Sequence, residues 1–457
     1  MAHPIIVWFR NDLRLADHQA LTAAALKGPV VPLYIYSEEE EGEWPLGGAS
    51  KVYLHDALIA LKQSIPELLI LEGRSLDVLL QVAGATGAKG VYWGRRYEPS
   101  SIARDSQVKE ALKKKSLEAV SFNHSLLLEP WNILNKSKQP YTVFTPYYKA
   151  VLKELEVAKP LPIPHFGCFK HSIPSDDLKL LPKVHWDRSI HSSWKAGEAQ
   201  AVLHLKAFCE AHLHDYEQTR NYPAIDQGVS HLSPALHFGE ISPRTIWHRV
   251  SQSKDSEPYL RQLVWRDFAH YLLYHFPHTD LHPLRKQFEA FPWHSDGAKW
   301  EAWKKGRTGY PFVDAGMREL WATGWMHNRV RMVVASFLVK DLLLPWQQGA
   351  RYFWDTLVDA DLANNTFGWQ WSAGCGADAA PYFRIFNPTL QGEKFDPEGE
   401  YIRKWVPELK QVTSQWIHQP HTAPTKPRDY PLPIVDHAKA KEAALVAFHS
   451  LKEESHG

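Results

Sequence analysis

Two neighbouring segments concentrate residue types that can do chemistry. Leu357–Trp371 reads LVDADLANNTFGWQW, and Ser372–Pro388 reads SAGCGADAAPYFRIFNP. Two carboxylates two residues apart, a double Asn and two Trp residues among small side chains make a poor helix or strand by propensity. Two interpretations stay open. Either Asp359 and Asp361 cap a helix while the Asn residues form turns, or the segment is specialised for binding a ligand.

A second segment, Gly324–Met332, places basic residues among apolar ones. It reads GWMHNRVRM and contains His327, Arg329 and Arg331 at helical spacing. Residues two apart on a helix cannot share a face. We therefore expect one arginine to pair inward with an Asp while the other faces a cleft.

The elements that must position these residues fall into two classes. Between Pro4 and His124, β-branched and apolar runs alternate with amphipathic stretches, which predicts an α/β domain with a doubly wound parallel sheet over residues 1–130. Its five expected strands are IIVWF, VVPLYIY, LLILE, GVYWG and AVSFN. The turn after the first strand, Arg10–Asp17, lacks the G-x-G-x-x-G pattern, which argues against a dinucleotide site there.

The remainder of the chain has a different pattern. Residues 131–195 are rich in Pro, Lys, Ser and His and lack periodicity, so they are predicted to be a connector between domains. Helical spacing then dominates residues 196–457, which predicts an all-helical domain whose last helix covers His437–Lys452.

Composition bounds the function. The 457 residues suffice for two or three domains, and 52 basic against 51 acidic residues leave a net charge of +1, so a nucleic-acid site would have to be a local patch. The three cysteines, Cys168, Cys209 and Cys375, have neither disulfide nor zinc spacing, and no metal site is predicted. With no apolar run of about 18 residues, we expect no membrane contact and a cytoplasmic protein. The 19 tryptophans indicate a flat ligand or electron transfer.

Three long strings of the sequence resemble the DNA photolyase and cryptochrome family. They are VWFRNDLRLADH at Val7–His18, TGYPFVDAGMRELWATGWMHNRVRM at Thr308–Met332, and GWQWSAGCGADAAPYFRIFNP. The resemblance runs nearly end to end. It implies an N-terminal antenna domain, a helical domain that binds FAD and DNA, and blue-light chemistry.

The resemblance implies an FAD site in the helical region. Backbone N–H groups and hydroxyls at a helix start suit phosphate oxygens, and this chain has Val229 where the family usually has Thr. The residues that match cofactor-binding positions are Tyr216, Ser230, Leu232, Ser233, Arg266, Arg331, Asp359, Asp361 and Asn365. Among them, Arg331 is expected to pair with Asp359, Asp361 to contact the polar edge of the flavin, and Asn365 to face flavin N5.

The resemblance also gives the tryptophans a function. Trp369, Trp346 and Trp293 match a chain of three electron donors that leads from the flavin to the surface. A single Trp is more often core, but all three fall on matched positions. We therefore count these three and Asn365 as the catalytic residues.

A pocket for a flipped pyrimidine dimer is implied as well. The matching residues are Gln262, Trp265, Asn328, Arg329, Met332 and Trp371, and matching DNA-binding residues around the cavity are Arg220, Arg384 and Lys394. A dimer must leave the duplex to reach the flavin, and extrusion costs a few kcal/mol unless the flipped bases are stacked and hydrogen-bonded.

One residue departs from the usual pattern of dimer repair. Gln262 stands where such enzymes typically carry a Glu, and an amide supplies neither negative charge nor a proton. Enzymes that repair (6-4) lesions resemble this chain at Gln262, but they use paired histidines where it has His327 and Asn328. This difference favours the cyclobutane dimer. Asp267 also stands where Glu is usual, and the sequence offers no reason for the shorter acid.

The sequence therefore predicts a deoxyribodipyrimidine photo-lyase, a monomer that acts on DNA containing pyrimidine dimers. The alternatives are a cryptochrome-type photoreceptor without repair, which Gln262 makes more credible, and a protein that uses FAD only structurally. Asn365 favours repair, since plant cryptochromes typically carry an Asp there. The antenna chromophore stays open between a folate, a deazaflavin and none; Glu98 and the loop Glu38–Ser50 are in the expected cleft.

Overall fold

The computed structural model describes residues 3–379 and 383–454, with side chains described up to 451. The chain divides into two compact units, each made of several segments. Unit 1 comprises Met1–His214, Ser230–Pro277 and Val358–Asp361, and unit 2 comprises Asp215–Val229, His278–Leu357 and Leu362–Gly457. Each unit is described below by itself.

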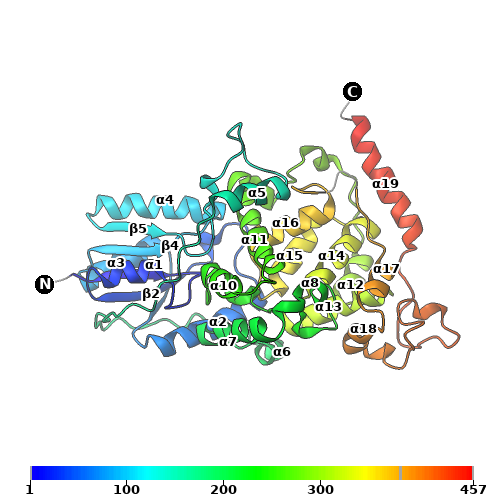
Figure 1. The fold of residues 1–457 in the computed structure, drawn as a ribbon, viewed down its shortest axis with the longest axis horizontal. Helices are drawn as coiled ribbons and strands as arrows, with labels where there is room; N and C mark the ends of the chain where they lie inside the picture. The colour runs from blue at the N-terminus through cyan, green and yellow to red at the C-terminus, as the bar shows by residue number, and fades with distance from the viewer. Residues whose placement is uncertain (1–2, 380–382, 455–457) are drawn as a thin grey trace. The chain divides into compact units, whose positions relative to one another are not determined.

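Unit 1 contains a five-stranded parallel sheet in the order β3-β2-β1-β4-β5 (Figure 1). The strands are β1 (Ile5–Phe9), β2 (Val30–Tyr36), β3 (Leu69–Glu72), β4 (Gly90–Gly94) and β5 (Glu118–Phe122). The chain moves outward from β1 to β3 and then crosses to β4, so the topological switch point lies between β1 and β4. The predicted doubly wound sheet is confirmed.

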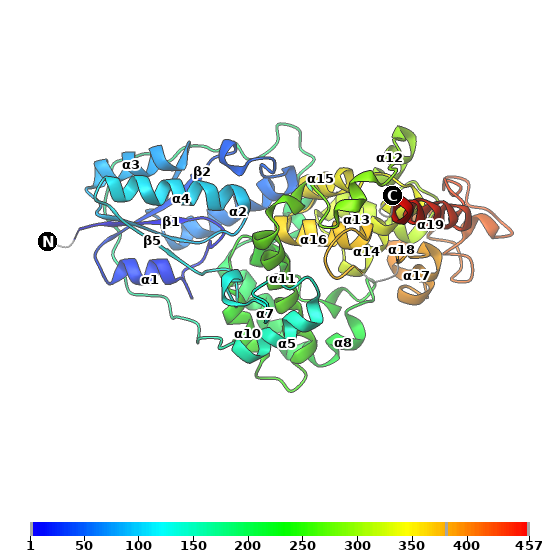
Figure 2. The same ribbon diagram turned by 90° about the horizontal axis from the view of Figure 1, so that it is seen from above.

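Side chains alternate between two cores because successive residues of a strand point to opposite faces. Val7 and Phe9 pack with the helices α1 (Gln19–Ala25) and α2 (Gly48–Ser64), whereas Ile6 and Trp8 pack with α3 (Ser75–Thr86) and α4 (Pro99–Lys114). Figure 2 shows α3 and α4 on the side of the sheet opposite to α1. Both faces are thus covered, which explains why the strands read as nearly continuous apolar runs.

The remainder of unit 1 is helical or irregular. The predicted connector, residues 131–195, contains α5 (Phe144–Glu154) and α6 (Arg188–Ser193) and is otherwise mostly irregular. The later helices of the unit are α7 (Glu198–Ala211), α9 (Ser233–His237), α10 (Pro243–Val250) and α11 (Glu257–His275). These helices belong to the same compact unit as the sheet, whereas the sequence analysis assigned them to the helical domain at residues 196–457. The predicted domain boundaries at residues 130 and 195 stay a prediction.

Unit 2 is formed by helices, as predicted for the C-terminal region. They are α8 (Tyr216–Thr219), α12 (Gly297–Lys304), α13 (Pro311–Thr323), α14 (Asn328–Ser336), α15 (Trp346–Thr356), α16 (Leu362–Ala373), α17 (Pro388–Phe395), α18 (Glu400–Trp405) and α19 (His437–Glu454). A π-helical turn, η7 (Phe337–Asp341), continues α14. Short 3₁₀ turns connect many of these helices.

Local sequence explains the ends of several of these helices. Pro311 occupies the first turn of α13, and Gly324 ends the helix with a positive φ of 69°. The Nδ1 atom of His327 then caps α14 by accepting a hydrogen bond from the N–H of Arg329. The turn that carries the GWMHNRVRM motif is therefore fixed from both sides.

The helix α16 forms where propensity opposes it. Its sequence, LANNTFGWQWSA, includes two Asn residues and a Gly, but Ala363, Thr366, Trp369 and Gln370 are buried along it. The helix packs against α15 and α14. Tertiary burial therefore outweighs the weak intrinsic preference. Within the residues that the structure describes, no helix combines the length and the apolar character needed to cross a membrane.

Candidate functional site

The two acids of the LVDAD motif are held by helices of unit 1. Ser233, at the start of α9, donates a hydrogen bond from its Oγ atom to Asp359 Oδ2 at 2.5 Å. The Oδ2 atom of Asp361 lies 3.3 Å from Nε2 of His270 on α11 and 4.0 Å from Nδ1 of His237 on α9. Both carboxylates therefore interact with side chains distant in sequence, as a ligand site requires.

The electrostatics around Asp361 favour its charged form. Burial alone raises the pKa of Asp361, but His270, Arg266 and His237 together hold it well below its ordinary value. Burial lowers the pKa of His237, although Asp361 and Asp359 oppose that shift. Among the described residues, the ring nitrogens of His237 and His270 are buried without a hydrogen-bond partner.

Unpartnered buried polar atoms are rare in folded proteins and usually have a ligand or water as partner. The donor and acceptor types present here, a carboxylate and two imidazoles, suit the polar edge of a flavin, which carries both N–H and C=O groups. Unit 1 thus fits the FAD predicted from the sequence.

The hydroxyls predicted to bind the pyrophosphate have partners within unit 1. Ser230 Oγ lies 2.8 Å from the hydroxyl of Tyr259, and Ser233 Oγ is bonded to Asp359. Leu232, between them, is buried. In unit 2, the ring of Tyr216 lies 5.6 Å from the guanidinium of Arg220. The assignment of these residues to the pyrophosphate stays a prediction.

Arg266 and Asp267 hold a segment of the chain that follows the sheet. Arg266 Nη1 donates to the carbonyl of Ser125 at 2.5 Å, and Asp267 Oδ2 accepts from the backbone N–H groups of Leu127 and Leu128 at 2.8 and 3.0 Å. Burial raises the pKa of Asp267 to about 6. The structure thus gives the shortened acid, which the sequence left unexplained, a structural function.

Trp265 is half-buried on α11, and one of its faces is covered. Its ring stacks on Phe144 of α5, with ring centroids 3.4 Å apart and planes inclined by 8°. One turn earlier, Gln262 Nε2 donates to the carbonyl of Pro258 at 3.1 Å, which leaves the amide oxygen as an acceptor. Phe144 is a residue that the sequence did not single out, and it lies in the predicted connector.

In unit 2, the start of α14 presents a row of predicted substrate residues. Asn328 is exposed, and its Nδ2 atom lies 4.0 Å from Sδ of Met332, one turn along the same face. Arg329 donates to Asn221 Oδ1 at 2.9 Å and lies 4.4 Å over the ring of Phe395. The structure brings these three predicted residues together and adds Asn221 and Phe395 as supports.

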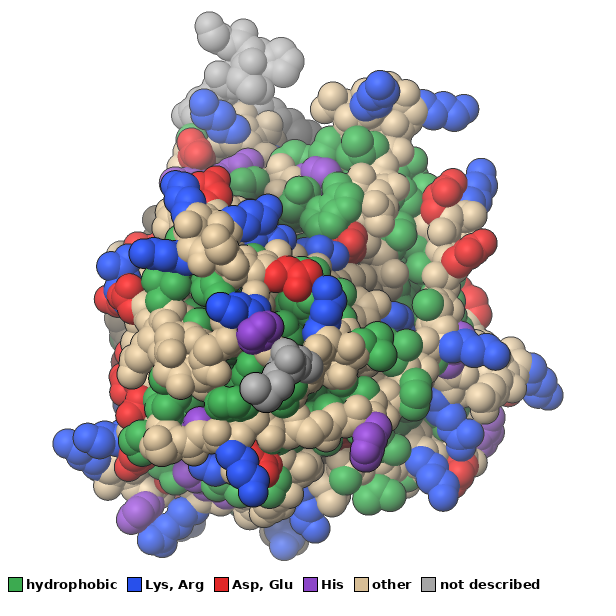
Figure 3. Space-filling model, turned by 90° about the vertical axis from the view of Figure 1, so that its left-hand side faces the viewer, with side chains coloured by type: hydrophobic (Ala, Val, Ile, Leu, Met, Phe, Trp, Pro, Cys, Tyr) green, Lys and Arg blue, Asp and Glu red, His purple; other side chains and the backbone are tan. Residues whose placement is uncertain are grey.

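Basic residues gather around Arg329. Burial, followed by the neighbouring charges of Arg220 and Arg384, lowers the pKa of Arg329. Lys394 lies 5.3 Å over the same Phe395 ring. Unit 2 therefore carries the local basic patch that a DNA-binding protein of near-neutral net charge needs. On the face of the molecule shown in Figure 3, by contrast, basic and acidic side chains are interspersed.

A small pocket, partly open to solvent, is lined by Trp371 in unit 2. Its lining includes Ser372, Arg384 and Lys340. Lys340 is buried on the π-helical turn; its Nζ atom lies 3.2 Å over the ring of Phe383 and donates to the carbonyl of Arg384 at 3.3 Å. Burial lowers the pKa of Lys340 to about 7. No pattern in the sequence singled out this lysine.

The predicted electron donors are all in unit 2. Trp369 and Trp346 are buried, and Trp293 is half-buried against Phe291, with ring centroids 4.3 Å apart. The ring contacts of Trp369 are with Phe353 at 4.9 Å and Trp303 at 6.3 Å, and Trp303 stacks in turn on Trp300 at 5.3 Å. The route through Trp346 and Trp293 stays a prediction.

Two further cofactor residues have defined partners in unit 2. Asn365 Nδ2 donates to the carbonyl of Ala350 on α15 at 3.0 Å, which fixes the orientation of its amide. Arg331 donates from Nε to the carbonyl of Met326 at 2.7 Å. Arg329 and Arg331 take different partners, Asn221 and the carbonyl of Met326. The expected pairing of Arg331 with Asp359 joins residues of different units and stays a prediction.

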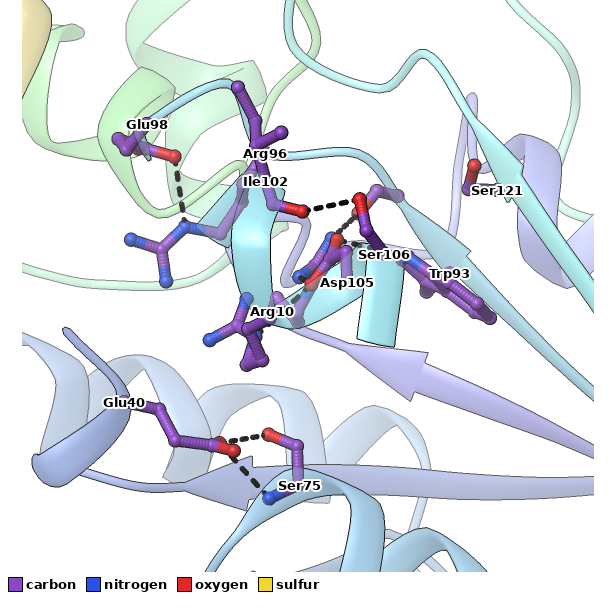
Figure 4. A network of polar contacts seen from close by, with 12 residues as sticks. Arg10, Glu40, Ser75, Trp93, Arg96, Glu98, Ile102, Asp105, Ser106 and Ser121 are labelled. Carbon is purple, nitrogen blue, oxygen red and sulfur yellow. Dashed lines mark hydrogen bonds and ion pairs between the residues drawn. The ribbon is translucent and has the colours of Figure 1, made fainter. Parts of the chain in front are cut away.

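The carboxyl ends of the sheet strands carry a dense ion-pair network, part of which is shown in Figure 4. Arg96 binds Glu41 through two hydrogen bonds of 2.7 and 2.8 Å. Its Nε atom also lies 3.3 Å from Oε2 of Glu98 (Figure 4). Arg10 binds Asp105 at 2.9 Å. Near them, Glu40 accepts from the backbone of Ser75. We call Arg10, Glu41, Arg96, Arg104 and Asp105 the sheet-end network.

Residues that the sequence placed in an antenna cleft lie in this network or pair with it. Glu98 pairs with Arg96. In the loop Glu38–Ser50, Glu38 pairs with Lys51 and Glu41 pairs with Arg96. The sequence left open whether an antenna binds, and the question stays open. Among residues 3–379 and 383–454, no cluster of three or more His, Cys, Asp or Glu side chains is arranged to hold a metal ion.

Comparisons with known proteins agree with these features. Residues 5–165 match the family model described as DNA photolyase, and residues 259–450 match the FAD binding domain of DNA photolyase. A deoxyribodipyrimidine photo-lyase of Agrobacterium fabrum is 44% identical, with 98% of each chain covered. Cryptochrome-2 of Arabidopsis thaliana is 39% identical, and the alignment covers 98% of this chain and 79% of the cryptochrome. The crystal structure of a bacterial class III photolyase from Agrobacterium tumefaciens superposes with a TM-score of 0.94 at 44% identity, covering 99% of this chain and 98% of the other.

Proposed function

Because the chain belongs to the DNA photolyase family, with an FAD-binding domain at residues 259–450, we propose that it repairs cyclobutane pyrimidine dimers in DNA under blue light. Membership confirms the predicted family, fold class, cofactor FAD and enzyme class. The lesion, the site residues and the choice against a photoreceptor are our proposals.

The observation that carries the proposal is the position of Trp265. It is half-buried on α11 and backed by Phe144, so it is held as a rigid, partly accessible ring. Stacking on an aromatic side chain contributes about 1–3 kcal/mol per base. That amount is comparable to the few kcal/mol needed to extrude a damaged base pair from the duplex. A rigid ring loses little entropy when a base stacks on it.

Other residues bind and orient the lesion strand. Arg329, fixed by Asn221 and Phe395, can pair with a phosphate without reorganising. Arg220, Arg384 and Lys394 add positive charge around it. Asn328 and Met332, on one face of α14, offer an amide and a polarisable thioether to the flipped bases.

When bound and reduced, FAD supplies the excited electron that splits the dimer and receives it back. Two side chains contribute to this chemistry in our proposal. Asp361 binds the polar edge of the cofactor, and Asn365 provides an amide with a fixed orientation. An amide is not an acid, so it does not release a proton towards the cofactor. Both features suit a site that keeps the reduced cofactor without protonating it.

The test is direct. Purified protein with bound, chemically reduced FAD is mixed with dimer-containing DNA and illuminated with blue light, and remaining dimers are measured by chromatography against a dark control. We expect loss of dimers only in the light. Persistence of dimers, with the FAD verified as reduced, would refute the repair function.

Lesion choice follows from Asn328. Repair of (6-4) lesions is expected to need a second histidine acid beside His327, and this chain has the exposed amide of Asn328 there. (6-4) lesions should therefore persist under conditions that clear cyclobutane dimers. Faster clearance of (6-4) lesions would mean that Gln262 determines the lesion.

A cryptochrome-type photoreceptor is the second candidate. It is favoured by Gln262, which lacks the carboxylate typical of dimer repair, and by the 39% identity with Cryptochrome-2 of Arabidopsis thaliana. The variant Gln262→Glu separates the two functions. If the protein is a repair enzyme, the unmodified chain repairs dimers and the Gln262→Glu variant repairs them faster. If it is a photoreceptor, the unmodified chain repairs none.

A further inference from the structure

Arg261 lies on α11, one turn before Trp265, so the two side chains share a face of the helix. Its Cζ atom lies 5.2 Å from the ring centre of Tyr148 and 5.7 Å from that of Phe144, both on α5. The rings of Phe144 and Tyr148 stack on each other with centroids 5.4 Å apart. Arg261 therefore lies beside the same Phe144 ring that backs Trp265.

The position of Tyr148 is fixed by a hydrogen bond to the other helix. Its hydroxyl donates to Glu257 Oε1 in the first turn of α11 at 2.8 Å. Arg261 and Tyr148 are both half-buried, whereas Phe144 is buried. The two rings thus form a firm support for a guanidinium that solvent can reach.

This support leaves the hydrogen-bonding capacity of the guanidinium unused. A contact with an aromatic ring restrains an arginine without using its N–H donors. Within the part of the chain that the structure describes, the partners of Arg261 are these two rings and not a carboxylate. Arg261 therefore keeps its positive charge and its planar set of donors, the arrangement that binds a phosphate through two hydrogen bonds.

We propose that Arg261 binds one of the phosphates that flank the dimer in the lesion strand. The inference rests on the proposed stacking of a flipped base on Trp265. A strand whose base covers the indole carries its flanking phosphates past the edge of that ring. Arg261, one turn away on the same face of α11, is placed to meet one of them.

The dependence of binding on salt separates this function from a structural one. A phosphate contact releases a bound counterion, so its loss makes the affinity for a single strand less sensitive to salt, by about 0.7 in the slope of log Kd against log salt concentration. An arginine that only fixed α5 to α11 would weaken DNA binding when replaced, but the slope would stay. The slope is therefore the diagnostic quantity.

The experiment uses the FAD-bound protein and a single-stranded oligonucleotide with one cyclobutane dimer, and measures Kd in the dark by fluorescence anisotropy at several NaCl concentrations. Arg261→Gln should weaken binding by about threefold to tenfold at low salt and reduce the slope by about 0.7. Arg261→Lys keeps the charge and should keep the slope. Arg249→Gln is the matched control: it removes the same charge from α10, where Arg249 pairs with Glu210 at 3.3 Å, and should keep both the parental affinity and the parental slope.

A second series of oligonucleotides locates the phosphate. In each, one phosphate near the dimer is replaced by an uncharged methylphosphonate. At one flanking position this replacement should weaken binding by the unmodified chain as much as Arg261→Gln does. The variant should lose nothing further at that position, because both changes remove the same contact.

Thermal unfolding of each variant checks that it is folded. A parental slope in the Arg261→Gln variant, an equal loss of slope in the Arg249→Gln variant, or additive losses at every methylphosphonate position overturns the inference even if the protein repairs dimers. A reduced slope confined to the Arg261→Gln variant supports it even if illumination repairs no dimer, in which case the proposed repair function alone fails.

Discussion

Two polar clusters of unit 1 differ in how their charges are balanced. In the sheet-end network, each arginine faces a carboxylate: Arg10 faces Asp105, and Arg96 faces Glu41. Around Asp361, the carboxylate faces two histidines whose ring nitrogens have no hydrogen-bond partner in the described part of the chain. In the first cluster every arginine has a carboxylate partner, whereas in the second a carboxylate lies beside two buried imidazoles.

A high density of charged residues is therefore not sufficient to identify a ligand site. The sheet-end network has more charged residues, and it lies at the carboxyl ends of the strands, where doubly wound sheets often bind ligands. Its three arginines nevertheless each pair with at least one of its two carboxylates. The smaller cluster around Asp361, where the ring nitrogens of His237 and His270 have no hydrogen-bond partner among the described residues, is the one that we propose to contact the cofactor.

Among the variants, we expect the largest change in rate when Trp369 is replaced. This variant tests whether Trp369 passes electrons to the flavin. Phe in place of Trp keeps an aromatic ring against Phe353 but is much harder to oxidise. Photoreduction of oxidised FAD by the Trp369→Phe variant should slow by at least about tenfold, since each added 1.4 kcal/mol of barrier costs that factor. Flavin absorption under blue light gives the rate.

Two controls sharpen this result. Repair by the chemically reduced Trp369→Phe variant should persist, since the repair cycle returns its electron. Trp346→Phe and Trp293→Phe should slow photoreduction less severely. If instead Trp303→Phe has the larger effect, the stacked pair Trp303 and Trp300 is the route, in agreement with the ring contact of Trp303 with Trp369. A parental rate in the Trp369 variant would contradict any route through this residue.

The next effect concerns the stacking ring of unit 1. Trp265→Ala removes the surface on which a base stacks, so the affinity for dimer-containing DNA should fall by about 1–3 kcal/mol, measured by fluorescence anisotropy. Phe144→Leu removes only the supporting ring and should weaken binding less, by about 1 kcal/mol. Equal affinities of the Trp265→Ala variant and the parent would exclude this residue from the lesion pocket.

A variant of the sheet-end network tests whether this network stabilises the fold or binds a ligand. Glu41→Gln removes the carboxylate that forms two hydrogen bonds with Arg96, and leaves Glu98 as the remaining carboxylate beside this largely buried arginine. Unfolding free energy should fall by about 1–3 kcal/mol, seen as a lower midpoint in thermal denaturation. FAD affinity and dimer repair should be unchanged. Loss of FAD binding with an unchanged melting temperature would show that the network is a ligand site after all.

The smallest effect is a pH dependence of stability in unit 1. Buried Glu240 accepts hydrogen bonds from Tyr53 Oη at 2.7 Å and from the N–H of Gly197 at 2.5 Å, and burial raises its pKa to about 7. Its unfolded value is lower, so the folded state binds the proton more tightly. The stability that it contributes is present at pH 4 and is lost as pH rises towards 7.

The variant Glu240→Gln isolates this group. At pH 8 it should be more stable relative to the parent than at pH 4, by about 1–2 kcal/mol. Denaturant unfolding at the two pH values measures the difference. An identical difference at both pH values would show that Glu240 does not titrate in this range.

The sequence predicted most of the fold because local patterns decide it. Runs such as IIVWF and VVPLYIY became β1 and β2, since a strand buried on both faces must be apolar throughout. The helix α16 was harder to recognise, because burial of Trp369 and Gln370 rather than propensity stabilises it. Where tertiary packing decides, local composition misleads.

Supporting residues were not predictable in the same way. Phe144 behind Trp265, and Asn221 beside Arg329, are far from their partners in sequence and belong to residue types with many ordinary uses. The clamp by Asp267 on Leu127 and Leu128 likewise uses backbone groups, which carry no sequence signal. Only the folded chain brings these contacts together.

The stack of Phe144 on Trp265 also restricts how a base could meet the proposed lesion pocket. Since one face of the indole is covered, a base can stack only on the opposite face. The two bases of a dimer are joined in a fixed 5′ to 3′ order, so only one of them can meet this ring in a given orientation. If Trp265 stacks the lesion as we propose, one base of the dimer contacts the indole and the other does not, so the two bases would have different surroundings although they are chemically the same.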